Sequence, residues 1–247
     1  MFRRSAMPPT IKAVLFDKDG TLVDFRATWV AAYRGVAKEL AERAGGGPEL
    51  ARHLLRCAGY DPDADRFDEE SPLLWATSET VAALWQAEPA LRRVPDVGAV
   101  VTAHFGDHRR YPPVPIGDLG DLLTRLRRRR LELGIATMDS TEKARATVAD
   151  LGIAEHFVFV AGADAGHGAK PEPGMVHAFC DVVGCTPEET VVVGDSRADL
   201  AMARNAGCAV AVAVRSGGTP SRLLAPLADA VIGDVQELDD LLDRLAA

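Results

Sequence analysis

The chain opens with a short apolar run and then changes to a helical pattern. Residues 11–16 read IKAVLF, which is typical of a strand covered on both faces. Apolar side chains then recur at helical spacing from Trp29 to Leu40, and three glycines at 45–47 end that pattern. From there to about residue 108 the sequence predicts further helical pieces and no strand. The proline-rich segment 109–117, RRYPPVPIG, predicts a linker.

After this linker, strand and helix patterns alternate to the end of the chain. Gly184 is expected to end one helix, and Asp139 with Glu142 is expected to form the capping box of another. Such alternation predicts an α/β fold with a doubly wound parallel sheet, in which all strands end at one edge. The strands are expected at 131–136, 157–160, 190–193, 209–214 and 230–232.

The two patterns divide the chain into two predicted domains. Residues 1–25 and 111–247 form the α/β core domain, and residues 26–110 form a small all-helical domain inserted into it. With 247 residues, 47% of them hydrophobic, the chain is long enough to bury a core without disulfides.

Charge and cysteine content narrow the range of functions. A formal net charge of −8 argues against nucleic acid as a partner, and the basic run Arg127 to Arg130 is interpreted as a solvated helix end. The four cysteines lack metal-type spacing and are interpreted as buried apolar residues in a reducing compartment. The N-terminal MFRRSAMPPT is followed by no signal-type apolar run, and no segment is apolar enough to span a membrane. We therefore expect a cytoplasmic protein with no membrane partner.

Polar residues follow the predicted strands of the core. Because parallel strands end at the same edge, we expect these side chains to meet there. Converging carboxylates are costly unless a cation compensates them, and oxygen ligands suit Mg²⁺. A lysine and a hydroxyl facing that ion indicate an anionic substrate such as a phosphate. The residues in question are Asp17, Asp19, Thr137, Lys170, Asp195 and Asp199.

Taken singly, each of these residues has an ordinary explanation. An Asp after a strand is commonly a turn former or a helix N-cap, and a lone lysine is commonly solvated. Strand alternation also predicts that Lys18, between the two aspartates, points away from them.

Four motifs together resemble those of the haloacid dehalogenase superfamily. They are DKDGT at 17–21, the strand-end Thr137, KPEP at 170–173 and GDSRAD at 194–199, in matching order and spacing. The helical insert resembles the small cap of the subfamily that contains phosphoglycolate phosphatases. The resemblance implies a Mg²⁺-dependent phosphatase that hydrolyses a small-metabolite phosphate monoester, phosphoglycolate-like or a sugar phosphate, through an aspartyl-phosphate. We expect a monomer or homodimer whose partner is this small-molecule ester.

The resemblance also implies a role for each motif residue. Asp17 would attack phosphorus, and Asp19 would protonate the leaving alkoxide and then take a proton from water. Thr137 and Lys170 would bind the transferring phosphoryl oxygens. The metal ligands would be Asp17, Asp195 and the carbonyl of Asp19, with Asp199 supporting that site.

Three positions depart from the common pattern of the superfamily. Met138 stands where relatives often have Asn, Gly174 where they often have Asp, and Lys18 where an apolar residue is commoner. None of these belongs to the groups that perform the chemistry.

The residues leave other functions open. A phosphomutase of the β-phosphoglucomutase type would share every core residue. Dehalogenation needs no second aspartate, so Asp19 argues against it, and the insert argues against a receiver-like domain. In the insert, Arg26, Trp29 and Arg34 are candidate substrate contacts, against the alternative that Trp29 belongs to the insert's core and both arginines are solvated.

Overall fold

The computed structural model describes residues 10–74 and 76–246, and the chain divides into two compact units. The first holds the chain up to Val23 and from Pro115 onward, and the second holds Asp24–Val114. The predicted insert, residues 26–110, lies inside the second unit. The N-terminal segment in which no signal was expected, residues 1–9, lies outside the described part.

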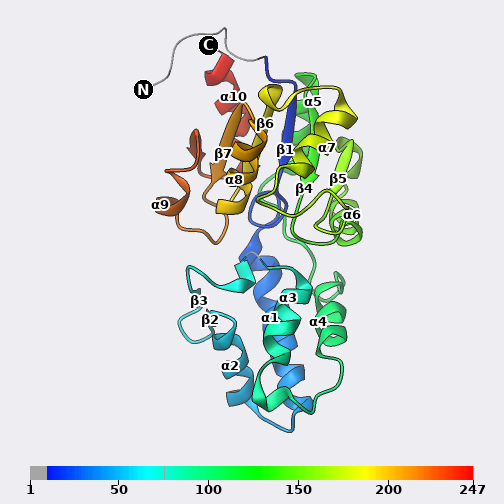
Figure 1. Cartoon of the computed structure of the whole chain (residues 1–247), viewed down its shortest axis with the longest axis vertical. Coiled ribbons are helices and arrows are strands. Elements are labelled where there is room, and N and C mark those ends of the chain that lie inside the picture. The colour runs from blue at the N-terminus through cyan, green and yellow to red at the C-terminus, as the bar shows by residue number, and fades with distance from the viewer. Residues whose placement is uncertain (1–9, 75, 247) are drawn as a thin grey trace. The chain divides into compact units, whose positions relative to one another are not determined.

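The first unit alternates strands and helices (Figure 1). Its elements are β1 (Ala13–Phe16), α5 (Leu119–Arg128), β4 (Glu132–Ala136), α6 (Thr141–Asp150), η3 (Ala154–His156), β5 (Phe159–Ala161), α7 (Gly174–Val183), η4 (Pro187–Glu189), β6 (Thr190–Gly194), α8 (Arg197–Ala206), β7 (Val210–Val214), α9 (Ser221–Leu224), β8 (Ala230–Ile232), η5 (Val235–Glu237) and α10 (Leu238–Ala246).

A six-stranded sheet forms the centre of this unit. Its order is β5-β4-β1-β6-β7-β8, and every neighbouring pair is parallel. The chain passes from β1 to β4 and β5 on one side and then to β6, β7 and β8 on the other, so the winding reverses beside β1. The predicted doubly wound parallel sheet is confirmed. Sheets of this order bind ligands outside the carboxyl ends of the strands, at the reversal.

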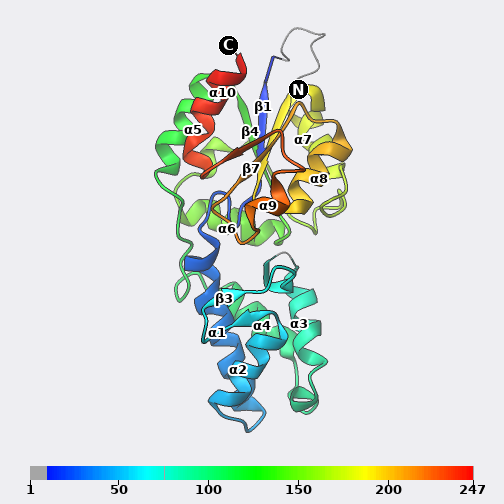
Figure 2. The ribbon, with the colours of Figure 1, turned by 90° about the vertical axis from the view of Figure 1, so that its left-hand side faces the viewer.

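Helices cover both faces of the sheet (Figure 2). Helices α5 and α10 pack over one face, and α7 and α8 pack over the other. Because successive strand residues face opposite ways, Val14 and Phe16 join the first core cluster while Ala13 and Leu15 join the second. Burial on both faces explains why β1 reads as an uninterrupted apolar run.

Of two helix boundaries predicted in this unit, one is confirmed and the other is wrong. Gly184 ends α7 in the left-handed conformation with φ of 72°, as expected. The capping box predicted from Asp139 and Glu142 is wrong, because Ser140 is the N-cap of α6 and accepts a hydrogen bond from the Lys143 amide. The Asp139 side chain instead accepts a bond from the Ser140 amide.

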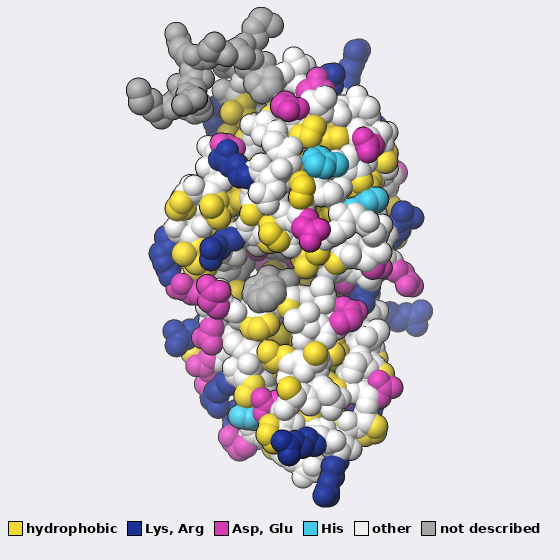
Figure 3. All heavy atoms as spheres, in the orientation of Figure 1, with side chains coloured by type: hydrophobic (Ala, Val, Ile, Leu, Met, Phe, Trp, Pro, Cys, Tyr) yellow, Lys and Arg dark blue, Asp and Glu magenta, His cyan; other side chains and the backbone are white. Residues whose placement is uncertain are grey.

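The basic run lies at the carboxyl end of α5, as interpreted from the sequence. Two of its arginines pair with acidic side chains: Arg127 with Glu132 at 2.5 Å and Arg129 with Asp239 at 2.6 Å. On the face drawn in Figure 3, basic and acidic side chains are interspersed.

The second unit is built mainly of helices. A minimal antiparallel hairpin, β2 paired with β3, is the departure from the all-helical expectation. The elements are α1 (Phe25–Arg43), α2 (Pro48–Cys57), β2 (Tyr60–Asp61), β3 (Arg66–Phe67), η1 (Pro72–Leu74), α3 (Ser78–Gln86), η2 (Pro89–Leu91) and α4 (Val97–Phe105).

This unit has an apolar core of its own, centred on Trp85. The Trp85 side chain is fully buried and its indole Nε1 donates to the Leu54 carbonyl at 2.9 Å, which joins α3 to α2. Trp29 stacks on Tyr33 with ring centroids 6.1 Å apart and packs against the same core. Trp29 is therefore part of the packing of this unit, as the alternative interpretation had it.

The four cysteines differ in their exposure to solvent. Of the cysteines, Cys180 is buried and Cys185 and Cys208 are half-buried, but Cys57 is exposed, so the expectation that all four are buried is wrong. Cys57 is the last residue of α2, where its side chain leaves the packed face.

Among the described helices, none is both long enough and apolar enough to cross a membrane.

The core of the second unit gives a stability prediction. Trp85→Ala removes a fully buried indole and its hydrogen bond, and should destabilise this unit by about 3–5 kcal/mol. Gln86→Ala, at the exposed neighbour on α3, should cost less than about 1 kcal/mol. Urea denaturation followed by circular dichroism measures both, and equal midpoints for the two variants would contradict the prediction.

Candidate active site

The carboxyl ends of β1, β4 and β6 lie level with one another in the sheet. Phe16 pairs with Ile135 on one side and with Val193 on the other. The residues just beyond these strand ends are therefore neighbours, and the Asp17 amide donates to the Val193 carbonyl at 2.8 Å. Register alone places the first, second and fourth motifs at one edge of the sheet.

Lys170 joins two of the predicted aspartates. Its Nζ donates to Asp17 Oδ1 and to Asp199 Oδ1, each at 2.5 Å. All three side chains are buried. The lysine is therefore a structural counter-charge of the cluster as well as a candidate phosphate ligand, which the sequence had not indicated.

Asp199 is fixed by the first turn of α8. Ser196 is the N-cap of this helix, and its amide and hydroxyl both donate to Asp199 Oδ2, at 3.0 and 2.6 Å. The Asp199 amide donates back to Ser196 Oγ, which completes a capping box. One oxygen of Asp199 thus binds Ser196 and the other binds Lys170, so this carboxylate supports the site by orienting the lysine.

The Asp195 carboxylate packs against two glycines, Gly20 and Gly217. A Cβ built on Gly20 would come within 2.5 Å of Asp195 Oδ2, and one built on Gly217 would come within 1.8 Å of the same atom. Gly20 also has φ of 85°, which a residue with a side chain rarely adopts. Both glycines are therefore needed for the carboxylate to lie where it does.

Asp19 is held by its sequence neighbour. Lys18 Nζ lies 2.6 Å from Asp19 Oδ2 and 3.4 Å from Asp139 Oδ2, and the lysine side chain is 2% exposed. The prediction that Lys18 points away from the aspartates is wrong for Asp19. Strand β1 ends at Phe16, and the Leu22 and Val23 amides donate to the Lys18 carbonyl in a tight turn, so strand alternation no longer applies there.

Thr137 and Gly174 occupy tightly packed positions in their loops. Thr137 is 2% exposed, its amide donates to the Ala161 carbonyl and its Oγ1 accepts from the Asp139 amide at 3.2 Å. Gly174 begins α7, and a Cβ there would come within 1.9 Å of the His167 carbonyl oxygen. The departure from Asp at this position is therefore explained by the close approach of the preceding loop.

The charges of the cluster favour a bound cation. Burial raises the pKa of Asp17 to about 7, even though the charge of Lys170 opposes the rise. The pKa of Asp195 is raised well above its ordinary value, mainly by burial and secondly by the negative charge of Asp17. One carboxylate oxygen from each of Asp17, Asp195 and Asp199 lies within 4.8 Å of the other two. These oxygen donors fit a hard divalent cation, which would neutralise the charge that Lys170 leaves uncompensated.

Sequence reasoning missed several contributors to this edge. Gly217 and Ser216 follow β7, and Ser216 Oγ donates to the Gly20 carbonyl at 2.7 Å, which ties this loop to the DKDGT turn. A Gly-Gly pair at 217–218, in the loop that follows a strand of the same sheet, was the available signal. Asp139, assigned to a helix cap from the sequence, belongs instead to the pairing of Lys18.

The profile of the haloacid dehalogenase-like hydrolases matches residues 11–207, which include every motif residue described above. The chain belongs to this family. The hydrolase is 37% identical over 254 residues to phosphoglycolate phosphatase of Rhodospirillum rubrum, with 96% of this chain and 95% of that protein covered. It is 32% identical over 242 residues to phosphoglycolate phosphatase of Chromobacterium violaceum, with 94% and 96% covered.

Solved structures support the same fold. The hydrolase superposes with a TM-score of 0.70 on a predicted phosphoglycolate phosphatase from Haemophilus somnus, at 18% identity, covering 94% of this chain and 98% of that one. The resemblance deduced from four short motifs is thereby confirmed at the level of family and fold.

The raised pKa values predict how pH changes metal-dependent stability. A carboxyl whose folded pKa lies above its unfolded value stabilises the metal-free protein at low pH, and this stabilisation is lost as pH rises toward about 7. A divalent cation binds the ionised form, so Mg²⁺ should raise the melting temperature more at about pH 8 than at about pH 5.5. Differential scanning calorimetry at both pH values measures the difference.

Two variants serve as controls for this experiment. Asp195→Asn should remove most of the Mg²⁺-dependent rise, whereas Asp181→Asn, an exposed position late in α7, should retain it. An equal rise at both pH values, or a full rise in Asp195→Asn, would contradict the assignment.

Proposed function

We propose that this hydrolase is a Mg²⁺-dependent phosphatase of small phosphate monoesters that acts through an aspartyl-phosphate. The observation that carries the proposal is the buried arrangement of Asp17, Lys170 and Asp199, with Asp195 beside it, at the carboxyl edge of the sheet. A carboxylate nucleophile, a cation and a fixed ammonium are the groups that phosphoryl transfer requires. The homologues named phosphoglycolate phosphatase support the same reaction.

Asp17 is the proposed nucleophile. One of its oxygens would form the bond to phosphorus while the bond from phosphorus to the ester oxygen breaks. Lys170, already 2.5 Å from Asp17, would stabilise the negative charge of the transferring oxygens, and Thr137 would donate its hydroxyl to them. Asp199 would keep the lysine in place through the second 2.5 Å contact.

Asp19 is the proposed general acid and base. It would give its proton to the leaving alkoxide and then take one from the water that cleaves the aspartyl-phosphate, which restores Asp17. Its contact with Lys18 at 2.6 Å fixes the orientation of the carboxyl. Lys18, a departure from the common pattern, would thus act by positioning Asp19.

The residues that would hold Mg²⁺ are Asp17, Asp195 and the main-chain carbonyl of Asp19. When bound, the ion supplies positive charge that offsets the phosphate and the carboxylates. Gly20 and Gly217 keep Asp195 close to this position because neither has a side chain.

The substrate class is inferred from the relatives and from the insert. The inserted helical unit would act as a cap that favours small esters, phosphoglycolate or a sugar phosphate. Two arginines that the sequence offers as substrate contacts have partners within this unit. Arg26 pairs with Asp65 at 2.8 Å, and Arg34 donates to the Tyr60 hydroxyl at 2.8 Å. A cytoplasmic monomer or homodimer remains the prediction from the sequence.

Replacement of the nucleophile tests the mechanism. Asp17→Asn should lower phosphate release from any ester by more than about 10³-fold, because an amide cannot form the aspartyl-phosphate. The exposed Asp181→Asn provides the same chemical change away from the sheet edge and should keep full activity. Colorimetric phosphate release measures both variants, and near-normal turnover by Asp17→Asn would rule the mechanism out.

A substrate comparison separates the phosphatase from the phosphomutase alternative. With phosphoglycolate the products should be glycolate and inorganic phosphate. With β-glucose 1-phosphate, ³¹P nuclear magnetic resonance should show either no reaction or free phosphate. Accumulation of glucose 6-phosphate in preference to free phosphate would assign the chain to the mutases instead.

A further inference from the structure

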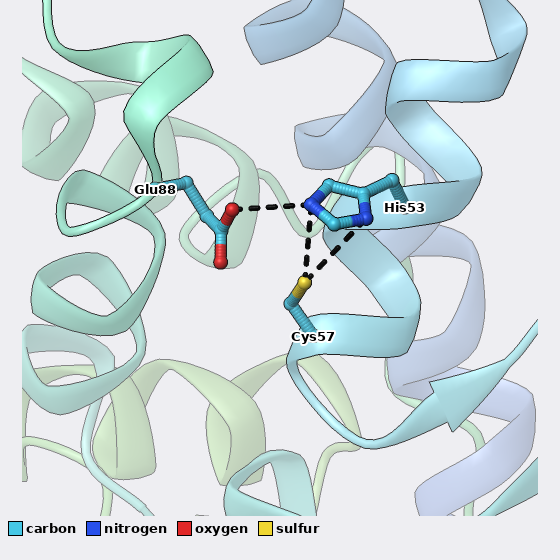
Figure 4. Close-up of side chains that lie close together, drawn as sticks. All are labelled: His53, Cys57 and Glu88. Atoms are coloured by element: carbon cyan, nitrogen blue, oxygen red, sulfur yellow. Dashed lines mark hydrogen bonds and ion pairs between the residues drawn. The ribbon is translucent and has the colours of Figure 1, made fainter.

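A second group of metal-type ligands lies in the helical unit. His53 and Cys57 are one turn apart on α2, and Glu88 follows α3 (Figure 4). His53 Nε2 lies 3.1 Å from Glu88 Oε2 and 3.3 Å from Cys57 Sγ. One donor atom from each of the three residues lies within 4.8 Å of the other two.

The direction of approach distinguishes this cluster from a catalytic triad. In a thiol–imidazole–carboxylate triad, the thiol and the carboxylate bind opposite nitrogens of the ring. Here Cys57 Sγ and Glu88 Oε2 both make their shortest contact with the same nitrogen, Nε2. The three donors therefore point to a common position, as ligands of one ion do.

The spacing suits tetrahedral coordination. With bonds of about 2.0–2.1 Å to nitrogen, 2.3 Å to sulfur and 2.0–2.2 Å to oxygen, donors around Zn²⁺ lie about 3.3–3.6 Å apart. The two measured separations, 3.1 and 3.3 Å, are within a few tenths of an ångström of these values. The third pair, Cys57 and Glu88, lies within 4.8 Å, so small side-chain rotations would bring all three donors to these separations.

The backbone under the ligands is already fixed. Trp85, three residues before Glu88, donates to the carbonyl of Leu54, the residue after His53, at 2.9 Å in the buried core. The Glu88 amide donates to the Trp85 carbonyl at 3.0 Å. The two elements that carry the ligands are thus joined beside the cluster, which reduces the ordering cost of binding.

We propose that His53, Cys57 and Glu88 bind a transition-metal ion of the Zn²⁺ class, with the fourth position open to water. Thiolate and imidazole ligands select such ions over Mg²⁺, which prefers oxygen. The site is separate from the all-oxygen cluster of the α/β unit. It would link α2 to the turn after α3 and so stabilise the helical unit.

Binding includes the loss of one proton. The Sγ–H bond of Cys57 breaks, the bond from sulfur to the metal forms, and the proton passes to solvent. Affinity should therefore increase with pH.

Cobalt substitution tests the proposal on the full-length chain. After chelation and buffer exchange, titration with Co²⁺ should give a thiolate-to-cobalt charge-transfer band that saturates at one ion per chain. Zn²⁺ should abolish this band, whereas excess Mg²⁺ should leave it unchanged. Zn²⁺ should also raise the melting temperature of the protein.

Variants separate this site from others in the chain. Cys57→Ser should remove the band, and His53→Gln and Glu88→Gln should each weaken Co²⁺ binding at least about tenfold. The controls His177→Gln, an exposed histidine on α7, and Cys185→Ser should behave as the wild type. Asp17→Asn should also retain the band, because that cluster has no sulfur.

Three results would overturn the proposal: no charge-transfer band on Co²⁺ addition, a band that persists in Cys57→Ser, or binding weaker than millimolar. Cys57 is exposed, His53 is 56% exposed and Glu88 is 21% exposed, so none of the three lies in the packed core and these substitutions should leave the fold intact. Circular dichroism of each variant checks this point.

Discussion

The cluster of charged side chains at the carboxyl edge of the sheet depends on one interaction, the bridge from Lys170 to Asp17 and Asp199. Buried carboxylates repel one another, and here a single buried ammonium contacts two of them at 2.5 Å each. The two aspartates raise the pKa of Lys170 despite burial, which by itself would lower it, so the lysine stays charged. This leaves Asp195 and part of the negative charge for a cation to neutralise. The proposed metal site and the proposed phosphoryl site therefore share one set of buried charges.

Close packing of charge against backbone explains the glycines around this edge. Gly20, Gly194 and Gly217 each face an aspartate at a distance that a Cβ would not permit. Gly194 lies against Asp199, and the other two lie against Asp195. The loops after β1 and β7 can thus approach Asp195, and the end of β6 can approach Asp199, because each has a glycine at the point of contact. The Ser196 capping box adds to this rigidity, since one hydrogen-bond pattern begins α8 and orients Asp199.

The helical unit has a different organisation. Its core is continuous around Trp85 and Trp29, and its hairpin holds Arg26 and Arg34 through Asp65 and Tyr60. These arginines are engaged within the unit, so they are poorer candidates for substrate contacts than their position in the sequence indicated. The group formed by His53, Cys57 and Glu88 brings together side chains from two of its elements, and His53 and Cys57 are exposed. Its proposed ion would reinforce a connection that Trp85 already makes.

The sequence by itself determined the alternation of strands and helices and the position of the insert, because hydrophobic periodicity is a local property of the chain. It also determined the strand-end residues Asp17, Thr137 and Asp195, because parallel strands joined by right-handed crossovers end at the same edge of the sheet. Only the tertiary structure decided which side chains pair. Lys18 turns toward Asp19 because β1 ends before it, and Asp139 leaves its expected cap to face that lysine. Gly217 and Glu88 are distant in sequence from the residues they meet, and no local pattern encodes such contacts. Pairing of this kind depends on where turns end and on packing between elements, which only the folded chain specifies.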